Sequence, residues 1–190
     1  MTVRLTLISP ATSGALREVR FDDDSPLDPG GAALAEAAAP AVPAAARAYR
    51  SPSVRCRDTA RALGLTAAPV DALAGCATGR WRGRTLAEVA ATEEAALAVW
   101  LSDPTAAPHG GESLSALRVR VGDWLDALGS GSGPVVVVAE PDVVRAATVH
   151  ALGAADATAR RLDVRPLTAV RLSGRAGRWN VLAGEPLTPR

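Results

Sequence analysis

Two charged residues, Arg55 and Glu140, are the strongest candidates for chemistry in this sequence. Arg55 lies in the first turn of a predicted helix, SVRCRDTARALG (53–64), where its guanidinium could bind an anion or cap a neighbouring loop. Glu140 directly follows the apolar run PVVVVA (134–139). A carboxyl group that loses water on burial can act as a general acid or base, so Glu140 is a candidate for proton transfer.

Other polar residues lie in predicted loops and turns. Ser9 and Thr12 belong to the turn SPATSG (9–14), where hydroxyl groups could bind a ligand but more often stabilise the turn itself. His109 is the histidine that falls in a loop, and we expect it to line a pocket. Three arginines share one short loop and form either a solvated basic surface or an anion clamp: Arg80, Arg82 and Arg84.

Composition limits the classes of function. The chain has 190 residues, which we expect to form a single domain over residues 1–190. A net charge of +1 argues against binding to nucleic acid or to an acidic membrane surface. Two histidines and two cysteines, all far apart, predict no metal site, and no motif indicates a cofactor. With Cys56 and Cys76 reduced and no secretory pattern at the N-terminus, we expect a cytoplasmic protein.

The pattern of apolar residues predicts an α/β fold. The β-branched runs 3–8 and 134–139 are typical of central parallel strands, and segments 167–173 and 178–184 predict a hairpin near a sheet edge. Amphipathic or well-capped segments between the strands predict helices at 29–39, 53–64, 85–103, 112–129 and 141–153.

Four segments, in this order, resemble the histidine phosphatase superfamily, which has the phosphoglycerate mutase-like fold. They are AYRSPSVRCRDTARALG (48–64), GRWRGRTLAEV (79–89), PHGGESLSALRVRVGDWLDAL (108–128) and PVVVVAEPDVVRAATVHALG (134–153). The resemblance implies a three-layer α/β/α sandwich around a mostly parallel sheet. It also implies an active site in which a histidine after the first strand attacks phosphate, with two arginines, a second histidine and an acid around it.

Most of those family positions carry other residues here. The Arg-His-Gly turn after the first strand aligns with Ser9, Pro10 and Ala11. The acid aligns with Gly75 and the second histidine with Glu140, whereas the phosphate-binding arginine after the second strand is kept as Arg55. Proline has no nucleophilic side chain and no backbone N–H, so the resemblance implies that the phosphohistidine step is lost.

The resemblance therefore leads to three hypotheses. The first is a pseudoenzyme that binds an anionic small molecule or a protein partner, with Arg55 and Glu140 paired across the old pocket. The second is a repurposed enzyme, in which Glu140 transfers protons and Arg55 orients an anionic substrate. The third is residual phosphatase or mutase activity, as the fold alone suggests. The oligomeric state is not predicted.

Overall fold

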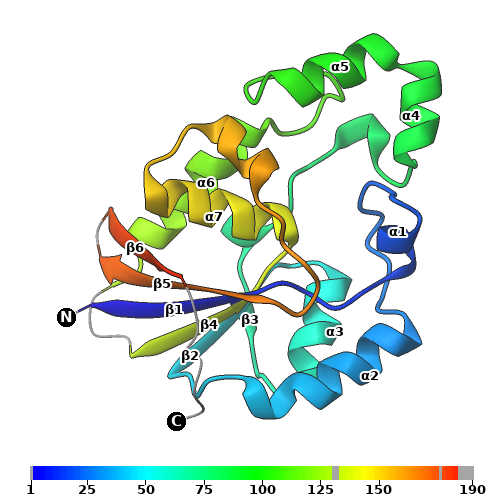
Figure 1. Cartoon of the computed structure of the whole chain (residues 1–190). Helices are drawn as coiled ribbons and strands as arrows, with labels where there is room; N and C mark the ends of the chain where they lie inside the picture. The colour runs from blue at the N-terminus through cyan, green and yellow to red at the C-terminus, as the bar shows by residue number, and fades with distance from the viewer. Residues whose placement is uncertain (1, 130–132, 176, 184–190) are drawn as a thin grey trace.

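The computed structural model describes residues 2–129, 133–175 and 177–183. Within them lies a six-stranded sheet with the strand order β3-β2-β4-β1-β5-β6 (Figure 1). The strands are β1 Val3–Ile8, β2 Arg47–Arg50, β3 Ala68–Pro69, β4 Pro134–Val138, β5 Ala169–Arg175 and β6 Arg178–Leu182. The first four of these in the strand order are parallel, and β5 and β6 are antiparallel to their neighbours. This is the mostly parallel α/β sheet that the sequence predicted.

Helices cover both faces of this sheet. The α-helices of the described residues are α1 Gly14–Arg17, α2 Pro29–Ala38, α3 Val54–Ala62, α4 Leu86–Thr92, α5 Glu94–Ser102, α6 Leu114–Asp126 and α7 Pro141–Leu152. Helices α2 and α3 lie on one face, and α6 and α7 lie on the other (Figure 1). The result is a three-layer α/β/α sandwich, as expected.

The valines of β4 divide the core between the two faces. Val135 and Val137 belong to the large apolar cluster with α6 and α7, whereas Val136 and Val138 belong to a smaller cluster with α3. Successive side chains of a strand point to opposite faces, so an uninterrupted run of valines fits a strand that is buried on both sides. This is why PVVVV forms a central strand.

The helices that flank the sheet begin where the sequence supplies a cap. Ser53 Oγ accepts a hydrogen bond from the N–H of Cys56 at 3.2 Å, which starts α3 as predicted. Helix α7 has Pro141 in its first turn and ends at Gly153, whose φ of 59° is the left-handed conformation that glycine adopts readily.

One predicted helix, 85–103, is two helices in the structure. The chain leaves helical geometry at Glu93, with φ −139° and ψ 41°, between α4 and α5. The Glu93 carboxylate accepts hydrogen bonds from the side chains of Trp81, Arg80 and Arg84 in the preceding loop. These long-range contacts fix the break, and helical periodicity does not encode them.

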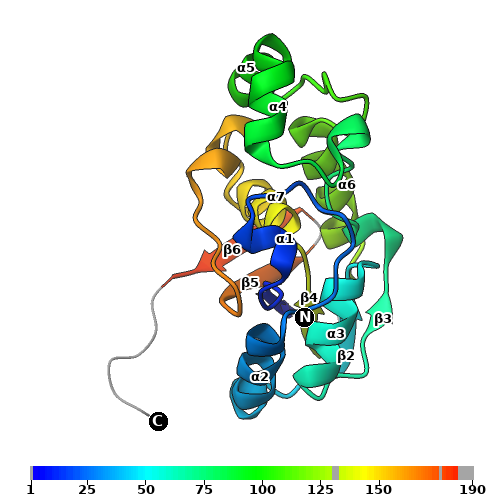
Figure 2. The ribbon, with the colours of Figure 1, turned by 90° about the vertical axis from the view of Figure 1, so that its right-hand side faces the viewer.

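Helices α4 and α5 form a lobe that lies away from the sheet (Figure 2). The lobe has a small core of its own, in which Trp81, Val89 and Leu97 are buried and Phe21 and Trp100 pack against them. Phe21 and Trp100 meet edge to face with ring centroids 5.7 Å apart. The segment that follows α1 is therefore tied to the lobe.

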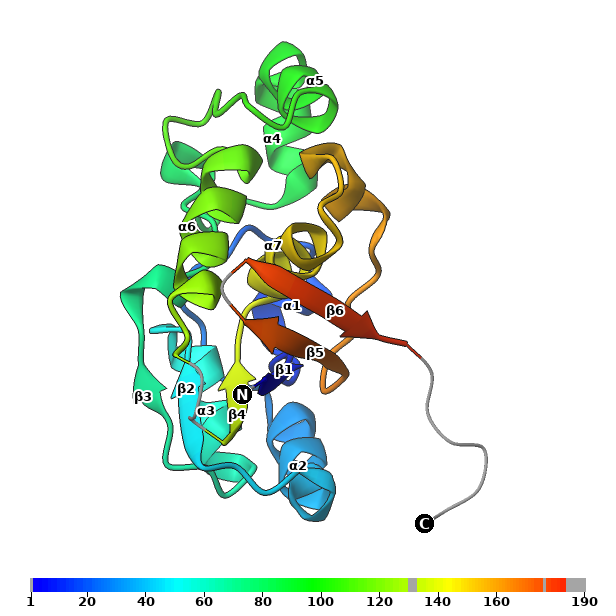
Figure 3. The same cartoon turned by 90° about the vertical axis from the view of Figure 1, so that its left-hand side faces the viewer.

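The predicted hairpin at the sheet edge is confirmed. Strands β5 and β6 lie beyond β1, and the register pairs Leu172 with Val181 (Figure 3). Gly184, the last residue of the predicted segment, lies outside the described residues. In the part of the chain that the structure describes, no helix has the length and apolarity needed to cross a membrane.

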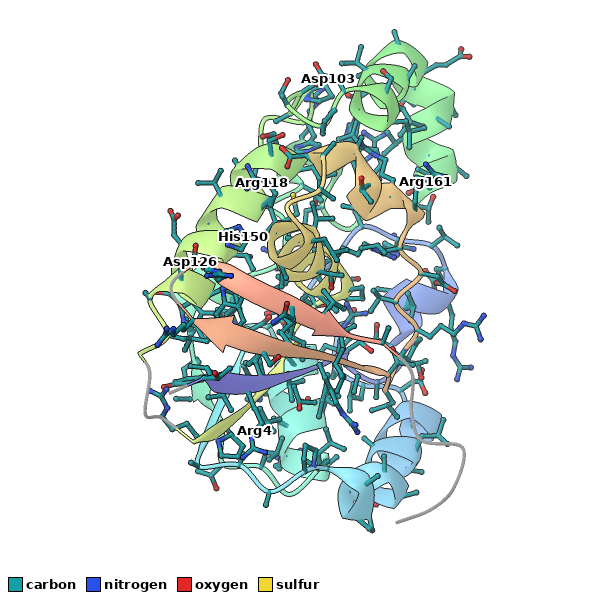
Figure 4. All side chains as sticks on the ribbon, turned by 60° about the vertical axis from the view of Figure 1, so that its left-hand side comes forward. Arg4, Asp103, Arg118, Asp126, His150 and Arg161 are labelled. Atoms are coloured by element: carbon teal, nitrogen blue, oxygen red, sulfur yellow. The ribbon has the colours of Figure 1, made fainter. Side chains whose placement is uncertain are left out.

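The packing of α6 against α7 requires a glycine at position 122. A Cβ atom there would lie 2.3 Å from Nδ1 of His150, whose ring is held by Asp126 across the helix pair (Figure 4). We expect Gly122→Ala to lower the free energy of unfolding by about 1–3 kcal/mol, because His150 must move. Gly14→Ala is the matched control, since a Cβ there meets nothing within 4 Å. Denaturant unfolding of both variants measures the difference, and equal stabilities would contradict this packing.

Candidate functional site

A cavity of about 1060 Å³ lies at the carboxyl ends of the parallel strands. Its walls come mainly from segments 20–24, 52–55, 74–79 and 140–145, and from the end of α5. The loops that follow β2 and β4 therefore meet here, as expected for an open parallel sheet. Of the residues singled out in the sequence, Arg55, Gly75, Arg82 and Glu140 line this cavity.

Arg55 and Glu140 form a buried ion pair beside the cavity, as the alignment predicted. Nη2 of Arg55 donates to Oε2 of Glu140, and the two residues are only 9% and 4% exposed. Burial alone would lower the pKa of Arg55, but the Glu140 carboxylate raises it above its ordinary value. The guanidinium is therefore charged, and its counter-ion is part of the chain.

The Glu140 carboxylate is also held on its other side. Its Oε1 accepts a hydrogen bond from Ser53 Oγ at 2.7 Å and lies 3.4 Å from the thiol sulfur of Cys56. The backbone N–H of Glu140 donates to Ser51 Oγ at 3.3 Å. Both carboxylate oxygens thus have partners from the start of α3, which fixes the side chain in place.

Gly75 leaves the space that Glu140 uses. A Cβ atom at position 75 would lie 3.2 Å from Cγ of Glu140 and 3.6 Å from Oδ2 of Asp142. The first distance is tighter than an ordinary van der Waals contact, so a long acidic side chain does not fit without moving its neighbours. The glycine at 75 and the glutamate at 140 are therefore sterically coupled.

Three further carboxyl groups line the cavity, and the sequence analysis did not single them out. Burial raises the pKa of Asp22, and the Glu140 carboxylate raises it further. Burial also raises the pKa of Asp142 to about 6, even though Asp142 accepts a hydrogen bond from the N–H of Cys76 at 2.6 Å. Asp24 accepts from the N–H of Val54 at the start of α3, at 2.8 Å. The acidic run at 22–24 was the signal in the sequence for two of them.

The three arginines of the loop before α4 do not act together. Arg80 and Arg84 both form ion pairs with Glu93, which hold the lobe together. Their hydrogen bonds, together with that of Trp81, lower the pKa of Glu93 to about 2. Arg82 alone lines the cavity, and it is exposed. Of the two alternatives for this loop, the clamp of three arginines does not fit the structure, because two of the guanidinium groups are paired with Glu93.

Ser9 and Thr12 stabilise turns, and neither is among the cavity residues. Ser9 is completely buried; its hydroxyl donates to the carbonyl of Arg165 and accepts from the N–H of Thr168 at 3.1 Å. The backbone carbonyl of Thr12 accepts from the N–H of Asp28 at 3.1 Å, which positions the start of α2. The Ser9 hydroxyl is therefore used in the contact with the loop before β5, and the ligand-binding role expected for Ser9 and Thr12 stays a prediction.

His109 is buried away from the cavity rather than lining it. Its Nδ1 accepts from the N–H of Gly111 at 3.0 Å, and its ring lies 5.0 Å from the Trp81 ring. Burial lowers the pKa of His109, and the charge of Arg80 lowers it further, so both effects favour the neutral imidazole. The loop position in the sequence did not reveal that this ring completes the core of the α4–α5 lobe.

The two cysteines are free thiols in the structure. Cys56 is buried against Glu140, and burial raises its pKa well above the ordinary value. Cys76 lines the cavity and donates to the carbonyl of Glu112, and burial raises its pKa to about 12. Neither sulfur is an activated nucleophile, because activation requires a lowered pKa.

The buried ion pair leads to a prediction about stability. Replacing one partner leaves the other as an uncompensated charge, so Arg55→Met or Glu140→Gln should each cost about 3–5 kcal/mol. The double variant should cost clearly less than the sum, because the two groups interact directly. Arg57→Met is the control, since its surface pair with Asp58 contributes at most about 1 kcal/mol. Urea unfolding measures all four, and additive costs would argue against the pair.

The raised pKa of Asp142 leads to a prediction about pH. The folded protein holds this proton up to about pH 6, whereas the unfolded chain loses it near pH 3.8. The contribution of Asp142 to stability is therefore present below pH 4 and is lost as the pH rises to 6, by up to about 3 kcal/mol. Asp142→Asn should abolish this part of the pH dependence. Unfolding free energies of both proteins at pH 4 and pH 7 test this, and parallel changes would refute it.

Comparisons with known proteins agree on one family. The family model of the histidine phosphatase superfamily (branch 1) matches residues 12–184. No curated protein matches the sequence. The solved structure of mycobacterial hydrolase 1 has 26% identity and a TM-score of 0.81 over 96% of this chain and 98% of that chain. The structure of a mycobacterial glucosyl-3-phosphoglycerate phosphatase has 25% identity and a TM-score of 0.78 over 95% and 97%. With the fold and the family model in agreement over nearly its whole length, the chain belongs to the histidine phosphatase superfamily.

Proposed function

We propose that this protein lacks phosphohistidine chemistry and acts by binding a ligand in the cavity at the ends of the strands. The observation that carries the proposal is the location of its histidines. The chain has two, His109 and His150. His109 packs on Trp81, and His150 bonds to Asp126 between α6 and α7, so neither lines the cavity. A phosphohistidine intermediate needs an imidazole that reaches the substrate.

The residue that follows the first strand supports the same proposal. In the resemblance described in the sequence analysis, Pro10 takes the place of the nucleophile, and it is buried directly beyond β1. The neighbouring Ser9, in place of a phosphate-binding arginine, uses its hydroxyl in the contact with the loop before β5. Both residues of this turn are uncharged. The positive charge that would bind a phosphate is therefore missing at the end of β1.

The contacts of Glu140 argue against the repurposed enzyme. A general base needs a free lone pair within reach of the substrate. The oxygens of Glu140 are engaged by Arg55 and Ser53, and the residue is 4% exposed. Residual phosphatase activity is compatible with the fold, because a structural neighbour is a phosphatase. An activity assay must therefore distinguish it from ligand binding without turnover.

The proposal predicts no turnover of p-nitrophenyl phosphate or of phosphoglycerates by the purified protein. The reason is that the covalent step has no nucleophile in the cavity. Initial-rate assays between pH 5 and pH 8 measure this, with Arg55→Ala as the control for any trace activity. Robust hydrolysis that disappears in Arg55→Ala would show that phosphatase chemistry persists and would overturn the proposal.

A thermal-shift screen separates a small ligand from a protein partner. A compound at 100 times its dissociation constant stabilises the native state by about 2.7 kcal/mol. The screen should contain phosphates, sugar phosphates, carboxylic acids and their uncharged analogues.

A cytoplasmic location stays a prediction, with which the two free thiols agree.

A further inference from the structure

Arg55, which lines the cavity, has one buried side-chain donor without an acceptor in the described part of the structure. Nε of Arg55 is buried and has no partner in the described part of the structure, whereas Nη2 of the same guanidinium is bound to Glu140. Arg55 is more than nine-tenths buried and lines the cavity. A buried N–H without an acceptor is unfavourable, so a ligand that brings an oxygen to Nε would gain that hydrogen bond.

The charges around this donor disfavour an anion. Glu140 already neutralises Arg55. Asp22, Asp24 and Asp142 line the same cavity, and none of the ion pairs found in the described residues includes them. An anionic group beside the Arg55 guanidinium would therefore meet the carboxylate of Glu140, which already occupies that position and repels a second negative charge.

Four other arginines line the cavity, so the whole lining contains five guanidinium groups and four carboxyl groups. Arg20 pairs with Glu18, and Arg145 donates to the carbonyl of Leu162 at 2.8 Å. Arg160 lies over the Trp100 ring, 5.5 Å from its centroid. Arg82 and Arg160 are exposed, so water screens them. The exclusion of anions is therefore a local property of the position beside Arg55 that Glu140 occupies.

One wall of the cavity is apolar. Phe21, Trp100, Leu101 and Leu114 all line it. Flat or aliphatic ligand groups gain by leaving water against such side chains, and the nearby polar groups then fix the orientation. The cavity thus offers an apolar surface together with one unused donor.

We propose that the cavity binds an uncharged ligand that has an apolar body and presents an amide carbonyl or hydroxyl oxygen to Nε of Arg55, and that Glu140 excludes anions. The inference rests on the proposed function, because it names the class of ligand for the same site. Glu140 is thus a specificity-determining residue: its carboxylate occupies the position beside Arg55 that an oxyanion would otherwise take.

Benzamide and benzoate test the inference, because they have the same body and differ in charge. Titrations followed by NMR shifts of the tryptophan indole N–H groups, at equal ionic strength, give both dissociation constants. We expect the wild-type protein to bind benzamide at least about tenfold more tightly than benzoate and not to bind inorganic phosphate. In Glu140→Gln the order should reverse, with benzoate and phosphate both gaining about tenfold or more.

A second variant keeps the test decisive if Glu140→Gln does not fold. Arg55→Lys keeps a cation for Glu140 but has no Nε donor. It should lose about tenfold in benzamide affinity while its melting temperature stays close to that of the wild type. Unchanged benzamide affinity in this variant would overturn the role of Nε.

The remaining outcomes are equally decisive. Wild-type protein that binds benzoate or phosphate as tightly as benzamide, or that does not bind benzamide, would overturn the inference. Hydrolysis of p-nitrophenyl phosphate, measured on the same preparation, would instead overturn the proposed function. Anion binding without hydrolysis therefore refutes only the ligand class, and the two failures are distinguishable.

Discussion

The buried ion pair between Arg55 and Glu140 is the constraint on which the candidate site depends. A guanidinium cannot lose its proton inside a protein, so a buried arginine needs a negative partner. Arg55 comes from the start of α3 and Glu140 from the start of α7, and these helices pack on opposite faces of the sheet. The pair therefore fixes the ends of two layers against each other at the place where the strands end.

Neighbouring residues are adapted to this pair. Ser53 both caps α3 and donates to Glu140, so one hydroxyl serves the helix and the carboxylate. Gly75 leaves room for the glutamate side chain. Burial raises the pKa of Asp22 and of Asp142, and the same carboxylate raises both further. The charge of the buried arginine is thus balanced within the chain, and this follows from a single residue after β4.

The carboxylate of Glu93 holds the lobe beside the cavity together. It accepts hydrogen bonds from the side chains of Trp81, Arg80 and Arg84, and Glu93 lies at the break between α4 and α5. The lobe in turn supplies Trp100, which lines the cavity next to Phe21. The cavity thus combines charged residues at the ends of the sheet layers with aromatic side chains packed on the lobe.

The sequence by itself determined the elements and their order. Local patterns predict the valine run of β4, the caps of α3 and α7 and the hairpin at the sheet edge. The reason is that hydrophobic periodicity, helix capping and turn formation depend on residues close together in the chain. The alignment with the family also placed Arg55 and Glu140 together. The tertiary structure alone decided that Ser9 and His109 are structural, that Asp22 and Asp142 line the cavity, and that Nε of Arg55 has no acceptor. These facts depend on burial and on contacts between residues far apart in the chain, and neither is written in local spacing.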